Sequence, residues 1–345
     1  MGDRQAVWAI GSADDPDAFD AYRQGLGGLY QIEGVAAPAR RRFYNRSGMA
    51  LTSSGIVGWG DSPAQTMTRT SSHIRRTDID GLTIVVNLTP VSADCDGCDV
   101  AAQAGDVQFR DLARPAAARY ERVRLSTLMV PRHAVPKALR DADTHGRVLA
   151  RGSEAGRVLS GHLRLLSRLA PLLSPEQLET GVQAALIMAA RGMDAIRVLA
   201  PEEETALRIS LRWRAGQMID RWLMDPALEP DLIVRACGGS RAALYRAFEA
   251  EGGVRRYIQS RRLERAYLHL LSDHGPRRIG DVALAHGFVS QPHFTRSFRS
   301  RFGCAPSSVG PDGAPVVEQA APGALAGAMR HGEAVAWLRA LKTSA

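Results

Sequence analysis

The stretch DLIVRACGGSRAALYRAFE (residues 231–249) returns as DVALAHGFVSQPHFTRSFR (residues 281–299), and this repeat decides the fold of the C-terminal region. The two copies align without a gap at an offset of 50 residues. Each copy predicts a short helix, a turn that contains glycine, and a second helix. Ser240 and Ser290 follow the turns, where a hydroxyl oxygen caps the next helix. We therefore predict two helix-turn-helix motifs, in which the second helix is the one that enters the major groove of DNA.

Helical geometry separates the buried face of each second helix from its outward face. Phe294, Phe298 and Phe302 recur every four residues and predict one buried stripe, and Leu244 and Phe248 do the same in the first copy. The remaining side chains point outward, where arginine, glutamine, histidine and tyrosine reach base edges or phosphates. The predicted DNA-binding residues are Arg241, Ala242, Tyr245, Arg246, Ser290, Gln291, His293, Thr295, Arg296 and Arg299.

The charge of the chain is concentrated around this repeat. Residues 205–310 contain 17 arginines and 9 acidic residues, a net charge of +8 that equals that of the whole chain. The other 239 residues hold 27 basic and 27 acidic residues and are balanced. A local basic excess of this kind predicts a polyanionic partner.

Several of these residues have a second interpretation. Arg246 and Arg296 either read DNA or contact a neighbouring carboxylate, and His293 either contacts DNA or packs beside Phe294. Residues 254–272 predict one long helix that connects the two motifs. Its arginines either support phosphate contact or form a solvated face with an internal pair such as Arg261 with Glu264.

The N-terminal region predicts strands. Residues 82–88 (LTIVVNL) form a β-branched run of buried-strand length, and residues 118–130 alternate like a second, longer strand. Asp96-Gly97 and Gly105-Asp106 are turn signals. Short strands at this spacing indicate a small sandwich or barrel.

Two amphipathic helices are predicted after the strands. Leu159, Leu163 and Leu166 fall at helical spacing, as do Leu178 and Val182, with prolines between the two segments. We interpret the helix pair as a dimer interface, and the alternative is that it only packs on its own β domain. A linker is expected over residues 200–205, and a flexible tail over residues 308–345.

The repeat region resembles the AraC/XylS family of transcription regulators. The resemblance rests on RRLERA at residues 261–266 and on I-x-D-V-A-x-x-x-G-F-x-S-x-x-H-F-x-R-x-F-x-x-x-F-G-x-x-P-S at residues 279–307. It implies a double helix-turn-helix that binds asymmetric promoter sites, usually as an activator, with RNA polymerase as a partner. The chain departs from the family pattern at Pro292 and at Ser308-Val309-Gly310.

The N-terminal region resembles the cupin-like effector-binding domain of the same family. Gly105-Asp106-x-x-x-x-Asp111-x-x-Arg114-Pro115 carries this resemblance, together with L-x-x-L-x-V-P-R at residues 125–132. It implies that the domain senses a small, often aromatic, molecule.

The sequence does not favour metal or redox chemistry. Cys95-Asp96-Gly97-Cys98 is an isolated pair, and its Asp-Gly centre is typical of a hairpin turn. No His-x-His pattern suggests a cupin metal site, so we expect no metal, no cofactor and no catalysis. The N-terminus has no signal-peptide pattern and no apolar run reaches membrane-spanning length, so we expect a cytoplasmic protein that does not bind membranes.

Together these features predict an α+β multidomain protein. We expect a cupin-like β-barrel at residues 1–130, a helical dimerisation segment at 131–200, a double helix-turn-helix at 205–307 and the tail at 308–345. The predicted function is an effector-responsive, DNA-binding homodimer. The alternatives are a ligand-free regulator whose barrel only oligomerises, and a cupin-type enzyme fused to a DNA-binding module.

Overall fold

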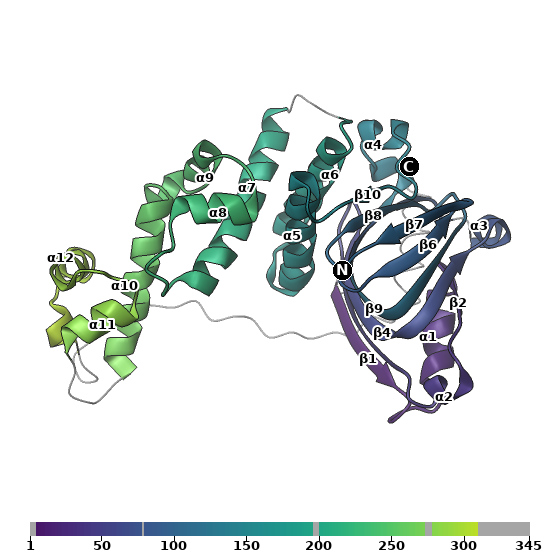
Figure 1. Ribbon diagram of the computed structural model, residues 1–345, viewed down its shortest axis with the longest axis horizontal. Helices are drawn as coiled ribbons and strands as arrows, with labels where there is room; N and C mark the ends of the chain where they lie inside the picture. The colour runs from purple at the N-terminus through teal and green to yellow at the C-terminus, as the bar shows by residue number, and fades with distance from the viewer. Residues whose placement is uncertain (1–4, 78, 196–199, 273–277, 310–345) are drawn as a thin grey trace. The chain divides into compact units, whose positions relative to one another are not determined.

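The computed structural model describes residues 5–77, 79–195, 200–272 and 278–309 (Figure 1). The chain divides between Leu207 and Arg208 into two compact units. We call the part before this division the β-unit and the part after it the helical unit.

The described residues of the β-unit form a ten-stranded antiparallel sheet. Its main path runs β1-β3-β4-β9-β5-β8-β10, with β2 paired to β4, and β6 paired to both β7 and β9. The strands are β1 (Gln5–Gly11), β2 (Gln31–Glu33), β3 (Tyr44–Leu51), β4 (Ile56–Arg69), β5 (Gly81–Asn87), β6 (Val91–Cys95), β7 (Cys98–Ala102), β8 (Val107–Asp111), β9 (Ala116–Pro131) and β10 (Val148–Leu149).

Two long strands curl this sheet (Figure 1). β4 pairs with β9 over most of its length, from Ile56 opposite Met129 to Arg69 opposite Ala116. On its other edge, β9 pairs first with β6 and then with β5, so one strand serves two parts of the sheet. All seven residues of β5 are buried, as the β-branched run predicts. The strands expected at residues 82–88 and 118–130 are therefore confirmed.

The turn between β6 and β7 is the predicted hairpin. Asp96 and Gly97 have φ angles of 56° and 83°, which is the backbone of a two-residue turn with both central residues in the left-handed region. Cys95 and Cys98 lie opposite each other on the two strands and are free thiols.

Short helices also lie among the strands, in a region where the sequence predicts mostly strands and turns. They and the helices that follow in the β-unit are α1 (Ala18–Leu26), α2 (Ala37–Arg40), α3 (Ser71–Thr77), η1 (Arg132–Ala134), α4 (Lys137–Asp141), α5 (Glu154–Leu169), η2 (Ala170–Leu172) and α6 (Pro175–Gly192). In α1, Phe19 and Tyr22 share the buried face and pack against Phe43.

The predicted helix pair is present as α5 and α6. Each helix begins at a capping serine: Ser153 accepts a hydrogen bond from the backbone of Gly156, and Ser174 forms a capping box with Gln177. The Ser167 hydroxyl of α5 donates to the carbonyl of Gly58 at 3.1 Å, which ties the helix to β4.

The remaining helices belong mainly to the helical unit. They are α7 (Pro201–Trp222), α8 (Pro230–Cys237), α9 (Arg241–Ala247), η3 (Glu249–Glu251), α10 (Val254–Ser272), α11 (Ile279–Ala285), α12 (Gln291–Phe302) and η4 (Pro306–Ser308).

The expected linker at residues 200–205 is wrong, because α7 begins at Pro201. Proline suits the first position of a helix, and the three glutamates that follow it stabilise the positive end of the helix dipole. Glu203 also accepts a hydrogen bond from the backbone of Ala200 at 2.8 Å.

Two hydrophobic cores divide the helical unit, and α10 belongs to both. Val254 and Ile258 at its start pack with Leu244 and Phe248 in the first core. Further along the same helix, Leu263 and its neighbours pack with the phenylalanines of α12 in the second core. The connecting helix expected at residues 254–272 is confirmed with these bounds.

No helix within the described ranges is long and apolar enough to cross a membrane. The predicted tail falls outside the described residues from residue 310 onward.

Candidate nucleic-acid interface and a buried cavity

The two predicted helix-turn-helix motifs are α8 with α9 and α11 with α12. Gly238 and Gly287 take φ angles of 73° and 75° in the turns. Ser240 accepts a hydrogen bond from the amide of Ala243 at 3.1 Å, and Ser290 accepts one from the amide of His293 at 3.4 Å. Both second helices therefore begin at the serine that the repeat places there.

The buried faces of α9 and α12 are those that the spacing predicts. Leu244, Phe248, Phe294 and Phe298 are all at most 1% exposed. Phe302 is only partly buried and packs at the edge of the second core, with its ring centroid 4.6 Å from that of Tyr267.

The predicted DNA-binding residues lie on the opposite faces. Seven of them are exposed and three are half-buried. The exposed residues are Arg241, Ala242, Arg246, Gln291, His293, Arg296 and Arg299, and the half-buried ones are Tyr245, Ser290 and Thr295.

The arginines of these faces differ in their partners. Arg241 forms an exposed ion pair with Asp231 at 3.2 Å. Within the described part of the chain, no carboxylate pairs with Arg246, Arg296 or Arg299. Their guanidinium groups are therefore available to an external acceptor, whereas that of Arg241 must first release a carboxylate.

Most arginines of the connecting helix form ion pairs or hydrogen bonds with other parts of the helical unit. Arg261 bonds Asp220 of α7 and Glu264 of α10, both at 3.0 Å, so the internal pair expected from the sequence is present. Arg262 donates to the carbonyls of Leu223 and Asp225 at 2.8 and 2.6 Å, beyond the end of α7. These arginines hold helices together, which the sequence pattern left open.

His293 lies at the edge of the outward face, as both of its interpretations require. Its Nε2 is 3.4 Å from the side-chain nitrogen of Gln259 on α10, and its ring is 6.1 Å from that of Phe288. Gln259 also donates to Ser297 of α12 at 2.8 Å. The side chain is exposed and still touches its own unit, so both interpretations stay open.

A cavity of about 130 Å³ lies inside the curled sheet of the β-unit. Its wall is mainly apolar and aromatic, with contributions from β3, β4, β5, β8, β9 and the segment around α1. The lining residues include Tyr22, Gly48, Trp59, Met67, Thr83, Arg110, Tyr120, Leu125 and Thr127. Leu125 belongs to the motif of the N-terminal resemblance, but none of these lining residues was predicted from the sequence as a ligand contact.

Gly48 shapes the wall next to Trp59. A Cβ atom at this position would lie 2.5 Å from the indole Nε1 of Trp59. Any residue with a Cβ atom at position 48 would collide with this ring, so the packing of Trp59 against β3 requires glycine.

The charged side chain of Arg110 lines the cavity. Arg110 on β8 is 3% exposed. One of its terminal nitrogens donates to the Gln108 side-chain oxygen at 2.6 Å and to the Tyr120 hydroxyl at 2.9 Å. Its Nε atom has no hydrogen-bond partner, and no described carboxylate pairs with it.

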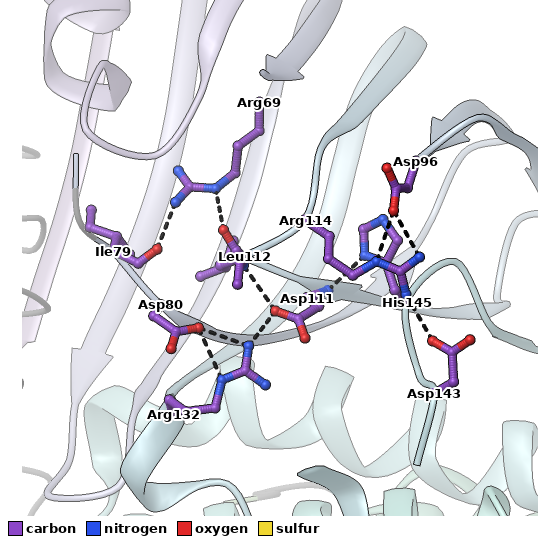
Figure 2. A network of polar contacts seen from close by, with 11 residues as sticks. Arg69, Ile79, Asp80, Asp96, Asp111, Leu112, Arg114, Arg132, Asp143 and His145 are labelled. Atoms are coloured by element: carbon purple, nitrogen blue, oxygen red, sulfur yellow. Dashed lines mark hydrogen bonds and ion pairs between the residues drawn. The ribbon is translucent and has the colours of Figure 1, made fainter. Parts of the chain in front are cut away.

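Three charged motif residues of the N-terminal resemblance, Asp111, Arg114 and Arg132, lie outside this cavity, in a structural network (Figure 2). Arg132 bonds Asp80 at 2.7 Å and also pairs with Asp111. Arg114 bonds Asp96 and Asp143, both at 2.9 Å. These ion pairs join loops and strand ends that are far apart in sequence.

His145 and Arg69 extend the same network (Figure 2). His145 accepts from the backbone N–H of Asp111 at 3.0 Å through Nδ1, and its Nε2 is 3.1 Å from the carbonyl of Pro115. Burial lowers the pKa of His145, which favours the neutral ring that this pattern requires. Arg69 donates to three backbone carbonyls, those of Leu112, Leu29 and Ile79.

Among the described residues, no three histidine, cysteine or acidic side chains are grouped as a metal site.

Comparison with known proteins identifies the helical unit. A family model described as a helix-turn-helix domain matches residues 233–310. The regulatory protein SoxS of Salmonella typhimurium is 33% identical over 96 residues, which cover 26% of this chain and 88% of SoxS. The chain belongs to the AraC/XylS family of transcription regulators.

A second AraC/XylS relative matches over a shorter region. The virulence regulon transcriptional activator VirF of Yersinia enterocolitica is 47% identical over 53 residues, or 15% of this chain. The match spans only 19% of VirF.

A solved structure resembles the fold of this AraC/XylS family member over about three quarters of the chain. The AraC-like transcriptional activator CuxR superposes with a TM-score of 0.50 at 20% identity, over 76% of this chain and 95% of CuxR. At this identity the likeness concerns the fold alone. The expected order of a β domain followed by an all-α domain is confirmed.

Proposed function

We propose that this AraC/XylS family member is a promoter-binding transcription regulator, and an activator, that responds to a small molecule held in the β-unit. The observation that carries the proposal is the exposure of Arg246 and Arg296 on the second helices, without an ion-pair partner in the part of the chain that the structure describes. Both lie on capped second helices, point outward, and have no carboxylate partner among the described residues.

Recognition follows from the chemistry of these faces. A guanidinium fork bonds O6 and N7 of guanine together, and the amide of Gln291 suits adenine in the same way. In this proposal Arg299 and the first amides of α12 contact phosphates. Two such helices joined by α10 suit neighbouring major-groove segments, about 34 Å apart along one DNA face. The expected target is therefore an asymmetric site.

The β-unit supplies regulation in this proposal. Its cavity is large enough for a small ligand, and α5 with α6 forms the dimer interface. Occupancy of the cavity shifts the equilibrium between conformations that differ in DNA affinity. Activation then requires contact with RNA polymerase, in keeping with the description of VirF as a transcriptional activator.

The test measures fluorescence anisotropy of the full chain with short duplexes that tile the DNA upstream of its own gene. We expect one duplex to bind tighter than its scrambled version at 100 mM salt. The double variant Arg246→Ala and Arg296→Ala should lose this preference.

The double variant Arg41→Ala and Arg75→Ala is the charge-matched control, because both arginines are exposed in the β-unit. It should leave DNA binding unchanged. Folded protein that binds no duplex even at low salt would show the proposal to be wrong.

A further inference from the structure

We propose that the β-unit cavity binds a small organic carboxylate whose anionic group pairs with Arg110. This assignment rests on the proposed function, in that it names the chemical class of the effector. It comes from the polar atoms of the cavity wall.

Arg110 is a buried cation whose described partners are neutral. The Gln108 oxygen and the Tyr120 hydroxyl hold the guanidinium in place but do not cancel its charge. Buried charges in proteins are normally paired with an opposite charge. A ligand carboxylate would supply this counter-charge and accept from the unpartnered Nε in a two-pronged contact.

Arg69 is the internal comparison. It is equally buried, at 1% exposed, and all three of its nitrogens donate to backbone carbonyls. Its hydrogen-bonding capacity is used by the fold. Arg110 therefore differs from this structural arginine, because it keeps a free N–H donor that a ligand can use.

Strand register places one unpartnered hydroxyl opposite Arg110 and a second one in the next row of the sheet. Thr83 of β5 lies directly opposite Arg110 of β8, and directly opposite residues share one face of a sheet. In the next row, Val85 lies between Gln108 and Thr127. The hydroxyls of Thr83 and Thr127 are buried, line the cavity and have no hydrogen-bond partner.

Asn45 on β3 adds a third polar group to the lining of the cavity. Its side-chain nitrogen is buried without a partner. Buried polar groups are rarely left unsatisfied in native proteins, and several around one cavity indicate polar groups on what fills it. The ligand is thus expected to carry hydrogen-bond acceptors as well as an apolar body, and the two oxygens of a carboxylate are such acceptors.

The size of the cavity limits the body of the ligand. Its volume of about 130 Å³ is close to that of an engineered cavity of roughly 150 Å³ that takes up benzene. Met67, Leu125 and Tyr22 form apolar wall around this space. One ring, or an aliphatic chain of similar volume, fits beside the carboxylate.

The test compares charged and neutral ligands of equal shape on the full-length protein. The probes are benzoate, cyclohexanecarboxylate and hexanoate, each beside its own carboxamide, measured by calorimetry and by thermal shift. We expect at least one carboxylate to raise Tm and to bind at least tenfold more tightly than its amide. Equal binding of acid and amide, or no binding by any probe, would overturn the assignment.

Two variants locate the charge preference. Arg110→Met should reduce the acid-to-amide affinity ratio to about one, and Arg110→Lys should keep part of it because the cation remains. Retention of the full ratio in Arg110→Met would also overturn the assignment. If Arg110→Met does not fold, the wild-type comparison of acid with amide still decides.

DNA binding, measured on the same preparations, separates the two proposals. Intact DNA binding without a carboxylate preference rejects the ligand assignment and leaves the proposed function standing. Carboxylate binding without DNA binding supports the assignment and rejects the proposed function.

Discussion

At the scale of single residues, the arginines of the helical unit divide by what their guanidinium groups touch. Arg246 and Arg296 meet no carboxylate among the described residues, and Arg261 meets two. The residue type is the same, but the free-energy consequence of removing it differs. An arginine with internal partners contributes to stability, whereas one that awaits an external acceptor contributes to binding.

We predict that Arg296→Ala weakens specific DNA binding by about 1–3 kcal/mol and relaxes base preference at one position, because a base-edge contact is lost. The measurement is a binding titration against duplexes substituted at each position. A loss that is uniform across sequences would identify Arg296 as a phosphate contact instead.

Arg261→Ala is the matched comparison on α10. Its ion pairs with Asp220 and Glu264 are about one-third exposed, so we expect a loss of about 1 kcal/mol or less in unfolding free energy. Base preference should not change. A changed base preference in a stably folded Arg261→Ala protein would contradict the division of roles.

His145 gives a pH-dependent prediction. Burial lowers its pKa in the folded state, so below the ordinary histidine pKa the unfolded chain binds more protons than the folded one. The contribution of His145 to stability is therefore complete above about pH 6.5 and declines as the pH falls toward the folded pKa.

Denaturant unfolding of the wild-type chain between pH 7.5 and 5 measures this decline. In the His145→Gln variant the dependence on pH should be shallower. An equally steep dependence in that variant would show that other groups are responsible.

At the scale of elements, the turn of the second helix-turn-helix depends on Gly287. Its φ of 75° is in the left-handed region, and a Cβ atom there would lie 2.8 Å from Nε of Arg262. Arg262 is itself held by the carbonyls beyond the end of α7. The turn and the connecting helix therefore fix each other.

We expect Gly287→Ala to destabilise the helical unit by roughly 1–2 kcal/mol from backbone strain alone. Gly161 on α5 is the control, because a Cβ atom there meets nothing within 4 Å. Gly161→Ala should stabilise the chain by about 0.5–1 kcal/mol, as in an ordinary helix interior. Thermal unfolding measures both, and an unchanged Tm in Gly287→Ala would refute the argument for this turn.

At the scale of the whole molecule, the two units have different electrical roles. The entire net charge of +8 belongs to residues 205–310, and the remainder is balanced. DNA binding that depends on released counterions should therefore be a property of the helical unit.

A fragment of residues 201–309, which includes all of α7, should bind DNA with the same salt dependence per bound helical unit as the full chain. The logarithm of the binding constant against the logarithm of salt concentration gives the two slopes. A much shallower slope for the fragment would mean that the β-unit also contacts phosphates.

Much of the helical unit was predictable because its signals are local. The offset of the repeat, the capping serines and the four-residue spacing of phenylalanines are all readable within a few turns of helix. The buried run in β5 is local in the same way. In α1, the spacing of Phe19, Tyr22 and Leu26 was a readable signal that was missed. The linker prediction was wrong because Pro201 and the three glutamates after it suit the first turn of a helix.

The sequence by itself therefore determined the double helix-turn-helix, the outward faces of its second helices and the strand-rich character of the β-unit. The tertiary structure alone decided which arginines are occupied and where the cavity lies. Asp220 meets Arg261 from another helix, and Tyr120 meets Arg110 from another strand. Partners of this kind come from distant parts of the chain, and no local periodicity records which side chains the folded sheet and helices bring together.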